Sequence, residues 1–174
     1  MTMAMDDIIN KVAASGIQTL DPAVFLPAAE DLVVFDLKPF LFRELILKEK
    51  DFREALKTHD WAVYQDRTVT ICCTADAIIP MWAYMLVTSY LKPVAADILY
   101  GSRQDAVRQM TRTAIENMDA EPYRDQRIVL KGCGDQPISE DAYIALMKKL
   151  QPVVKSVMFG EPCSTVPVYK QKKG

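Results

Sequence analysis

Stretches typical of β-strands recur along this chain, and their spacing limits the possible folds more than any other feature. Apolar runs rich in β-branched residues lie at Leu32–Phe35, Thr68–Cys72, Ala96–Tyr100, Arg127–Lys131 and Ser156–Phe159. From the second run onward they follow one another at roughly the length of a βαβ unit, which is about 30 residues. The sequence therefore predicts strands that are joined by helices.

Helical patterns fill the gaps between these runs. An amphipathic pattern covers residues 51–58, Ser102 and Asp105 resemble a capping box, and Ser139 precedes a pattern that Pro152 ends. The uncharged stretch 77–91 is too short for a bilayer, which takes about 20 residues, and predicts a buried helix. We expect an α/β fold: a mostly parallel sheet of successive βαβ units with helices on both faces.

The N-terminal part adds to this sheet. Apolar residues at helical spacing predict a first helix that Gly16 caps: Met5, Ile8, Ile9, Val12 and Ala13. We expect one domain over residues 1–174. Within it, residues 1–66 form a helix, an edge strand and a second helix, and residues 67–174 form a βαβαβαβ core with a C-terminal tail.

Net charge and the N-terminal sequence bear on the partners and the cellular location of the protein. The formal net charge is −2 and the pI is near 5.5, so we expect neither nucleic acid nor a membrane as a partner. The basic cluster Lys170, Lys172 and Lys173 is interpreted as a solvated tail, with phosphate binding as its minor reading. The start of the chain is acidic and lacks the pattern of a signal peptide, which predicts a cytoplasmic protein.

The four cysteines follow predicted strands. Cys72 and Cys73 end one strand, while Cys133 and Cys163 come shortly after two others. If these strands are parallel in one sheet, their carboxyl ends share an edge, where α/β proteins bind ligands. Cysteines in a reducing cytoplasm pack, ligate or react rather than form disulfides.

Three readings of these thiols remain open. Cys73, Cys133 and Cys163 can hold zinc at about 2.3 Å, with Cys72, His59, a carboxylate or water in the fourth position. The same thiolates suit iron or an iron–sulfur cluster. Alternatively the cysteines only pack in the core, or one of them is a reactive thiol. Adjacent strand residues face opposite ways, which favours Cys73, at the turn, over Cys72 as the functional thiol.

Other polar residues are weaker candidates for a pocket beside the thiols. His59, the only histidine, ends a predicted helix and is expected to be hydrogen-bonded and structural, with metal ligation or base catalysis as alternatives. Asp76 is expected to cap the helix after the cysteine pair, and a metal or proton-transfer role is its minor reading. Glu161 is interpreted as an exposed loop carboxylate that can also supply an oxygen ligand.

Several segments resemble a known bacterial family. LILKEKDFREALKTHDW, CTADAIIPMWAYML, EPYRDQRIVLKGCG and GEPCSTVPVYK are similar to the domain of unknown function 2480 of Bacteroidetes, over nearly the whole chain. The resemblance points to Cys72, Cys73, Cys133 and Cys163 as the site. Members carry histidine at position 72, and histidine shares metal ligation with cysteine more naturally than core filling. Family genes near those of iron–sulfur cluster assembly imply assembly proteins as partners.

Three functions follow from these residues. The first is a cytoplasmic protein that binds zinc or iron through cysteine thiolates, as an assembly accessory or a small metalloenzyme. The second is a thiol enzyme or sulfur carrier with Cys133 or Cys163 as nucleophile and His59 as base. The third is a binding or scaffold module whose cysteines only pack, and a second copy of the chain is one option for its partner.

Overall fold

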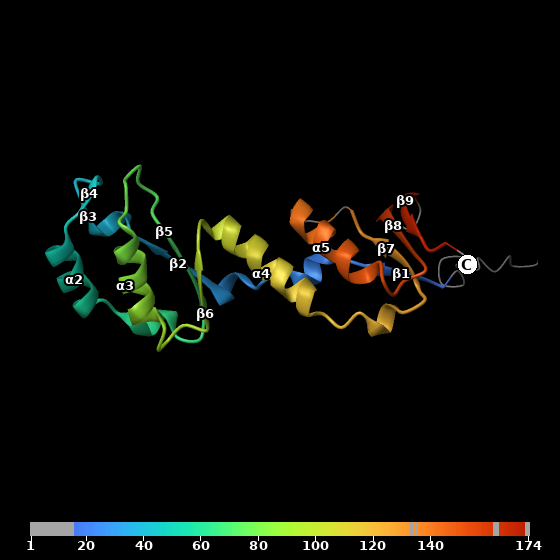
Figure 1. Cartoon of the computed structure of the whole chain (residues 1–174), viewed down its shortest axis with the longest axis horizontal. Helices are drawn as coiled ribbons and strands as arrows, with labels where there is room; N and C mark the ends of the chain where they lie inside the picture. Colours follow the sequence, from blue (N-terminus) through green and yellow to red (C-terminus); the bar gives the residue numbers. More distant parts are fainter. Residues whose placement is uncertain (1–15, 133, 135, 162–163, 173–174) are drawn as a thin grey trace, which may run out of the picture. The chain divides into compact units, whose positions relative to one another are not determined.

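The computed structural model describes residues 16–132, 134, 136–161 and 164–172 (Figure 1). The chain divides into two compact units. The first unit combines Met1–Leu26 with Thr111–Gly174, and the second unit is Pro27–Met110. Both units contain strands and helices, so the chain is an α/β protein.

A three-stranded parallel sheet organises the second unit. Its order is β2 (Leu32–Asp36), β5 (Thr68–Cys72) and β6 (Asp97–Tyr100), with β5 in the centre. Leu32 is paired with Thr68, and Thr68 with Asp97, so all three strands begin in line. The three carboxyl ends therefore lie along one edge.

Helices cover both faces of this sheet, as the apolar pattern predicted. On one face, a core that includes Phe35, Val69 and Ile71 contacts α2 (Glu49–Thr58) and α3 (Met81–Leu91). On the other face, Leu32 and Leu99 pack against Ala106 in the first part of α4, which spans Arg103–Asn117. A short hairpin of β3 (Leu41–Phe42) and β4 (Ile46–Leu47) completes the strands of this unit.

The start of α4 has the predicted capping box. Ser102 N donates to Asp105 Oδ2 at 3.0 Å, and Asp105 N donates to Ser102 Oγ at 3.2 Å. These two reciprocal bonds satisfy backbone donors that the first helical turn leaves free.

The first unit has a four-stranded mixed sheet in the order β1 (Ile17–Leu20), β7 (Arg127–Leu130), β8 (Ser156–Glu161) and β9 (Ser164–Lys170). The first three strands are parallel, and β9 runs antiparallel to β8. Its described core packs α5 (Glu140–Leu150) and the end of α4 against the sheet. The buried members of this core are Leu20, Ile115, Ile128, Leu130, Ala142, Ala145, Leu146, Leu150, Val154 and Val157.

Single-turn 3-10 helices join these elements. They are η1 (Pro22–Phe25) and η5 (Glu121–Tyr123) in the first unit, and η2 (Ala29–Asp31), η3 (Lys38–Phe40) and η4 (Trp61–Tyr64) in the second. In the part of the chain that the structure describes, no helix combines the length and apolar character that crossing a bilayer requires.

The prediction of one mostly parallel sheet is wrong in part. All five predicted strands form, but β5 and β6 belong to one sheet and β7 and β8 to another. The pattern did not predict β1 or β9; β9 makes the first unit's sheet mixed. The expected boundary between residues 66 and 67 falls inside the second unit, because β2 and β5 pair with each other across it. The predicted first helix lies outside the described residues.

Gly160 in β8 offers a test of the hairpin between β8 and β9. Its φ is +123°, and an added Cβ would lie 2.5 Å from the backbone oxygen of Ser164. We expect Gly160→Ala to lower the free energy of unfolding by about 1–3 kcal/mol, measured by urea denaturation with circular dichroism. Gly134→Ala is the matched control, because its Cβ would meet no atom within 4 Å. Equal stability of the two variants would contradict the argument.

Candidate functional site

Cys72 and Cys73 lie at the carboxyl end of the parallel sheet in the second unit. Cys72 is the last residue of β5, and Cys73 begins the loop that follows. Both thiols are free and half-buried. Cys73 packs against the α3 side of the core, and its Sγ donates to the backbone oxygen of Ala75 at 3.6 Å. Cys73 is therefore the thiol at the turn, as predicted.

Asp36 connects the ends of β2 and β5 beside these thiols. It is paired in register with Cys72. Its Oδ1 accepts hydrogen bonds from the backbone nitrogens of Lys38 at 2.9 Å and Thr74 at 3.0 Å, and Thr74 Oγ1 donates to Oδ2. Desolvation raises the pKa of Asp36, but the hydrogen bonds from Thr74 and Lys38 outweigh it, and the net pKa lies below its usual value. Asp36 is thus an ionised carboxylate that fixes the turn carrying Cys73.

The same environment disfavours the thiolate of Cys72. Burial raises its pKa, and the neighbouring acidic groups of Asp36 and Cys73 raise it further. The pKa of Tyr84, on α3, is also raised, first by burial and then by Tyr100 and the two cysteines. Cys72 is therefore a protonated thiol near neutral pH.

Cys133 and Cys163 lie outside the described residues. By sequence they fall in the first unit, after β7 and after β8, whereas Cys72 and Cys73 belong to the second unit. The expectation that one sheet brings all four thiols to a common edge is wrong, because β5 is not in the sheet of β7 and β8. The assignment of the four cysteines as metal ligands stays a prediction.

A cavity of about 430 Å3 lies at the carboxyl end of the sheet in the first unit. Its described lining is Asp21, Ala23, Lys131, Gly132, Gly134, Gln136, Pro137, Ile138, Tyr143 and Phe159. Lys131 Nζ pairs with Asp21 at 3.1 Å, and Tyr143 Oη donates to the backbone oxygen of Lys131 at 3.0 Å. A Cβ at Gly132 would lie 2.5 Å from the ring of Phe159, so that ring would have to shift.

His59 lies among aromatic rings in the second unit. Its Nε2 shares a hydrogen bond of 3.0 Å with Tyr64 Oη, and its ring makes an edge contact with Trp61 at 4.8 Å between centroids. Phe35 and Phe40 also contact it. These contacts give His59 the hydrogen bond that was expected and agree with a structural role.

Asp76 and Glu161 belong to different units. Asp76 is exposed, and α3 begins only at Met81 after Pro80, so the prediction that Asp76 caps this helix is wrong. Pro80 presets the first turn without a side-chain cap. Glu161 is the half-buried last residue of β8 and is paired with Ser164.

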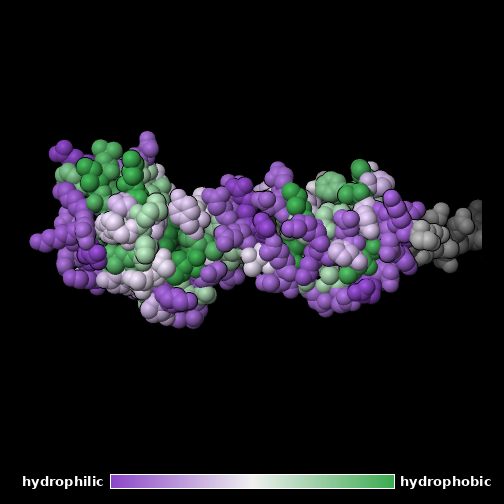
Figure 2. Space-filling view, viewed as in Figure 1, coloured by the Kyte–Doolittle hydropathy of each residue, from purple (hydrophilic) through white to green (hydrophobic). Residues whose placement is uncertain are grey.

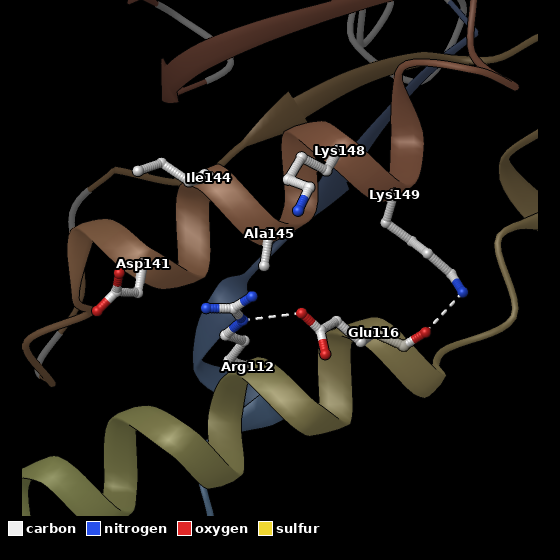
Figure 3. A pocket seen from close by; sticks show the side chains of 7 residues that line it. All are labelled: Arg112, Glu116, Asp141, Ile144, Ala145, Lys148 and Lys149. Carbon is white, nitrogen blue, oxygen red and sulfur yellow. Dashed lines mark hydrogen bonds and ion pairs between the residues drawn. The ribbon is translucent and has the colours of Figure 1, made fainter.

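Another cavity, of about 290 Å3, is lined mostly by charged residues of α4 and α5 (Figure 3). Arg112 Nε donates to Glu116 Oε1 at 2.8 Å, and Lys149 Nζ donates to the backbone oxygen of Glu116 at 2.7 Å (Figure 3). Arg112, Glu116 and Lys149 therefore already have hydrogen-bond partners within the cavity lining. Across the described residues, no three His, Cys, Asp or Glu side chains are arranged to hold a metal ion.

Asp36 and Tyr84 are the residues that the motifs in the sequence did not single out. Asp36 ends its strand as Cys72 does, so an acidic residue at a strand's carboxyl end was the available signal. Tyr84 lies within an uncharged helical run, and only the packing of α3 beside β5 gives it a role.

Comparison with known proteins assigns the chain to a family. Residues 6–171 match the family described as "Protein of unknown function (DUF2480)". No curated protein and no solved structure matches the chain.

The raised pKa of Cys72 predicts its alkylation behaviour. We expect Cys72 to react slowly with iodoacetamide at pH 7 and faster as the pH rises, because only the thiolate attacks. Asp36→Asn removes a negative charge that raises this pKa, so its rate–pH profile should shift to lower pH. Asp60→Asn, on the exposed turn after α2, is the matched control. All proteins carry Cys73→Ser, and mass spectrometry follows the Cys72 peptide. An unshifted profile in Asp36→Asn would refute the coupling.

Proposed function

We propose, for a chain that belongs to the DUF2480 family of proteins of unknown function, that it binds a transition metal ion, zinc or iron, through cysteine thiolates in the cytoplasm. One observation carries the proposal: two free, adjacent thiols stand at the carboxyl end of a parallel strand beside an ionised carboxylate. Thiolates are preferred ligands of zinc and iron–sulfur centres.

A metal site built on Cys72 and Cys73 would have coordination positions that the protein does not fill. Two protein thiolates leave further coordination positions to water, to a small thiol or to a second protein. An ion in an open site exchanges more readily than one held by four thiolates. This supports a role in which the metal is passed on, as an accessory protein of iron–sulfur assembly would do.

Proton competition tunes this site. A thiol must lose its proton to bind a metal ion, and burial raises the pKa of Cys72. Metal affinity should therefore increase as the pH rises. Asp36 holds the turn of Cys73 through Thr74, so its carboxylate positions the second thiol. Cys133 and Cys163 remain predicted ligands in the first unit's part of the chain.

Metal content tests the proposal. We expect wild-type protein, purified under reducing and chelator-free conditions, to carry zinc or iron, and Cys72→Ser/Cys73→Ser to lose most of it. Cys133→Ser/Cys163→Ser is the matched double variant, which tests the other pair separately. The proposal fails if the wild type holds less than about a tenth of an equivalent. The assignment of Cys72 and Cys73 as ligands also fails if Cys133→Ser/Cys163→Ser loses its metal while Cys72→Ser/Cys73→Ser keeps it.

A second candidate function, a binding module, is favoured by exposed hydrophobic side chains on the second unit. Ile78, Met81 and Met85 are 95%, 74% and 71% exposed. Figure 2 shows hydrophobic side chains near β3, β4 and the loop before α3. The run 77–91 carries no charge, so two copies can meet there without unpaired charges. The partner we propose is a second copy of this chain.

Sedimentation velocity tests the self-association. We expect a wild-type dimer, and a monomer for Met81→Lys/Met85→Lys, because two buried cations oppose the interface. Val24→Lys/Val63→Lys adds the same charge at other exposed positions and should leave the dimer intact. A wild type that is monomeric at every attainable concentration would eliminate this function.

A further inference from the structure

A groove of about 600 Å3 on the first unit is lined by four basic residues and by no described acidic residue. The basic residues are Arg127, Lys155, Lys170 and Lys172, and the rest of the described lining is Ile17, Ser156, Met158, Pro167, Tyr169 and Gln171. The groove lies at the end of the sheet where β7 and β8 begin and β9 ends. It is thus at the opposite end of these strands from the cavity beside Lys131.

Strand register holds the cations of the groove together. Arg127 is paired with Ser156, and Ser156 with Lys170, so the three residues form one row across β7, β8 and β9. Paired residues of neighbouring strands face the same side of a sheet, and two strand spacings separate Arg127 from Lys170 by roughly 10 Å. The interpretation of Lys170 as part of a solvated tail is therefore wrong, since it is the last residue of β9.

The backbone also holds the remaining two lysines near this row. Lys155 precedes β8, and its carbonyl oxygen accepts a hydrogen bond of 2.9 Å from Gln171 N. This bond continues the pairing of β8 and β9 by one step, to the residue before Lys172. Four cations from three separate parts of the sequence are therefore fixed at one end of the sheet.

The charge of the groove is uncompensated among the described residues. None of its four cations makes an ion pair there, whereas Arg53, Arg108 and Arg124 each pair with a nearby carboxylate. Like charges held together without counterions create a positive potential that attracts an anion. On a chain of net charge −2, this concentration of positive charge is local.

Size and lining indicate the kind of anion. We propose that this groove binds a compact ligand that carries several phosphates and has the size of a nucleotide. Its volume falls in the range of small-molecule sites, which is about 300–1,000 Å3. Arginine, lysine and the Ser156 hydroxyl suit phosphate oxygens. Ile17, Met158 and Pro167 offer apolar contact to the rest of a ligand. A long nucleic acid would need a more extended basic surface.

Isothermal titration calorimetry on the full chain tests the proposal with ATP and with tripolyphosphate, both free of magnesium. We expect saturable binding of one ligand per chain that weakens as salt increases. Lys170→Ala/Lys172→Ala should weaken it at least about tenfold, because two charge-assisted contacts are lost. Lys50→Ala/Lys92→Ala changes the net charge equally at exposed positions of the second unit and should leave the affinity within about twofold.

Each outcome decides the matter. Tighter binding of ATP than of tripolyphosphate supports a nucleotide, and equal binding supports the phosphates alone as the recognised group; both keep the proposal. Absence of saturable binding overturns it, as does an equal loss in the two double variants. Binding of a single-stranded oligonucleotide but of neither compact ligand also overturns it, because the partner is then a nucleic acid. Retained metal in Lys170→Ala/Lys172→Ala separates this site from the thiols.

Discussion

Parallel pairing of β5 between β2 and β6 is the constraint on which the second unit depends. Because the three strands begin in line, their last residues end at one edge of the sheet, and Asp36 comes beside Cys72. Alternation of side chains then sends Cys72 to one face and leaves Cys73 to the turn and to the α3 side. Two thiols that are neighbours in sequence thus acquire different surroundings.

Those surroundings set the chemistry of the pair. Burial and the charge of Asp36 keep Cys72 protonated, so it is a poor nucleophile near neutral pH. The hydrogen bonds of Asp36 to Thr74 and Lys38 keep that carboxylate ionised despite its partial burial. The raised pKa of Cys72 disfavours both nucleophilic attack and metal ligation near neutral pH, because each of them needs the thiolate.

The first unit uses the two ends of one sheet differently. At the carboxyl ends of β1 and β7, Lys131 and Asp21 form an ion pair and are the charged residues in the described lining of the cavity. At the opposite end, the antiparallel return of β9 adds Lys170 and Lys172 to Arg127 and Lys155. An antiparallel partner brings its last residues to the place where a parallel strand starts. The direction of one strand therefore decides where the positive charge gathers.

The sequence by itself determined the local elements. Residue periodicity predicted β2, β5, β6, β7 and β8 and the helices between them, and the capping box at Ser102 formed as predicted, because such signals act within a few residues. It could not determine which strands pair, since pairing depends on contacts between distant residues. Only the tertiary structure therefore decided that β5 and β7 lie in different sheets, that Asp36 lies beside Cys72, and that Lys170 and Arg127 line the same groove.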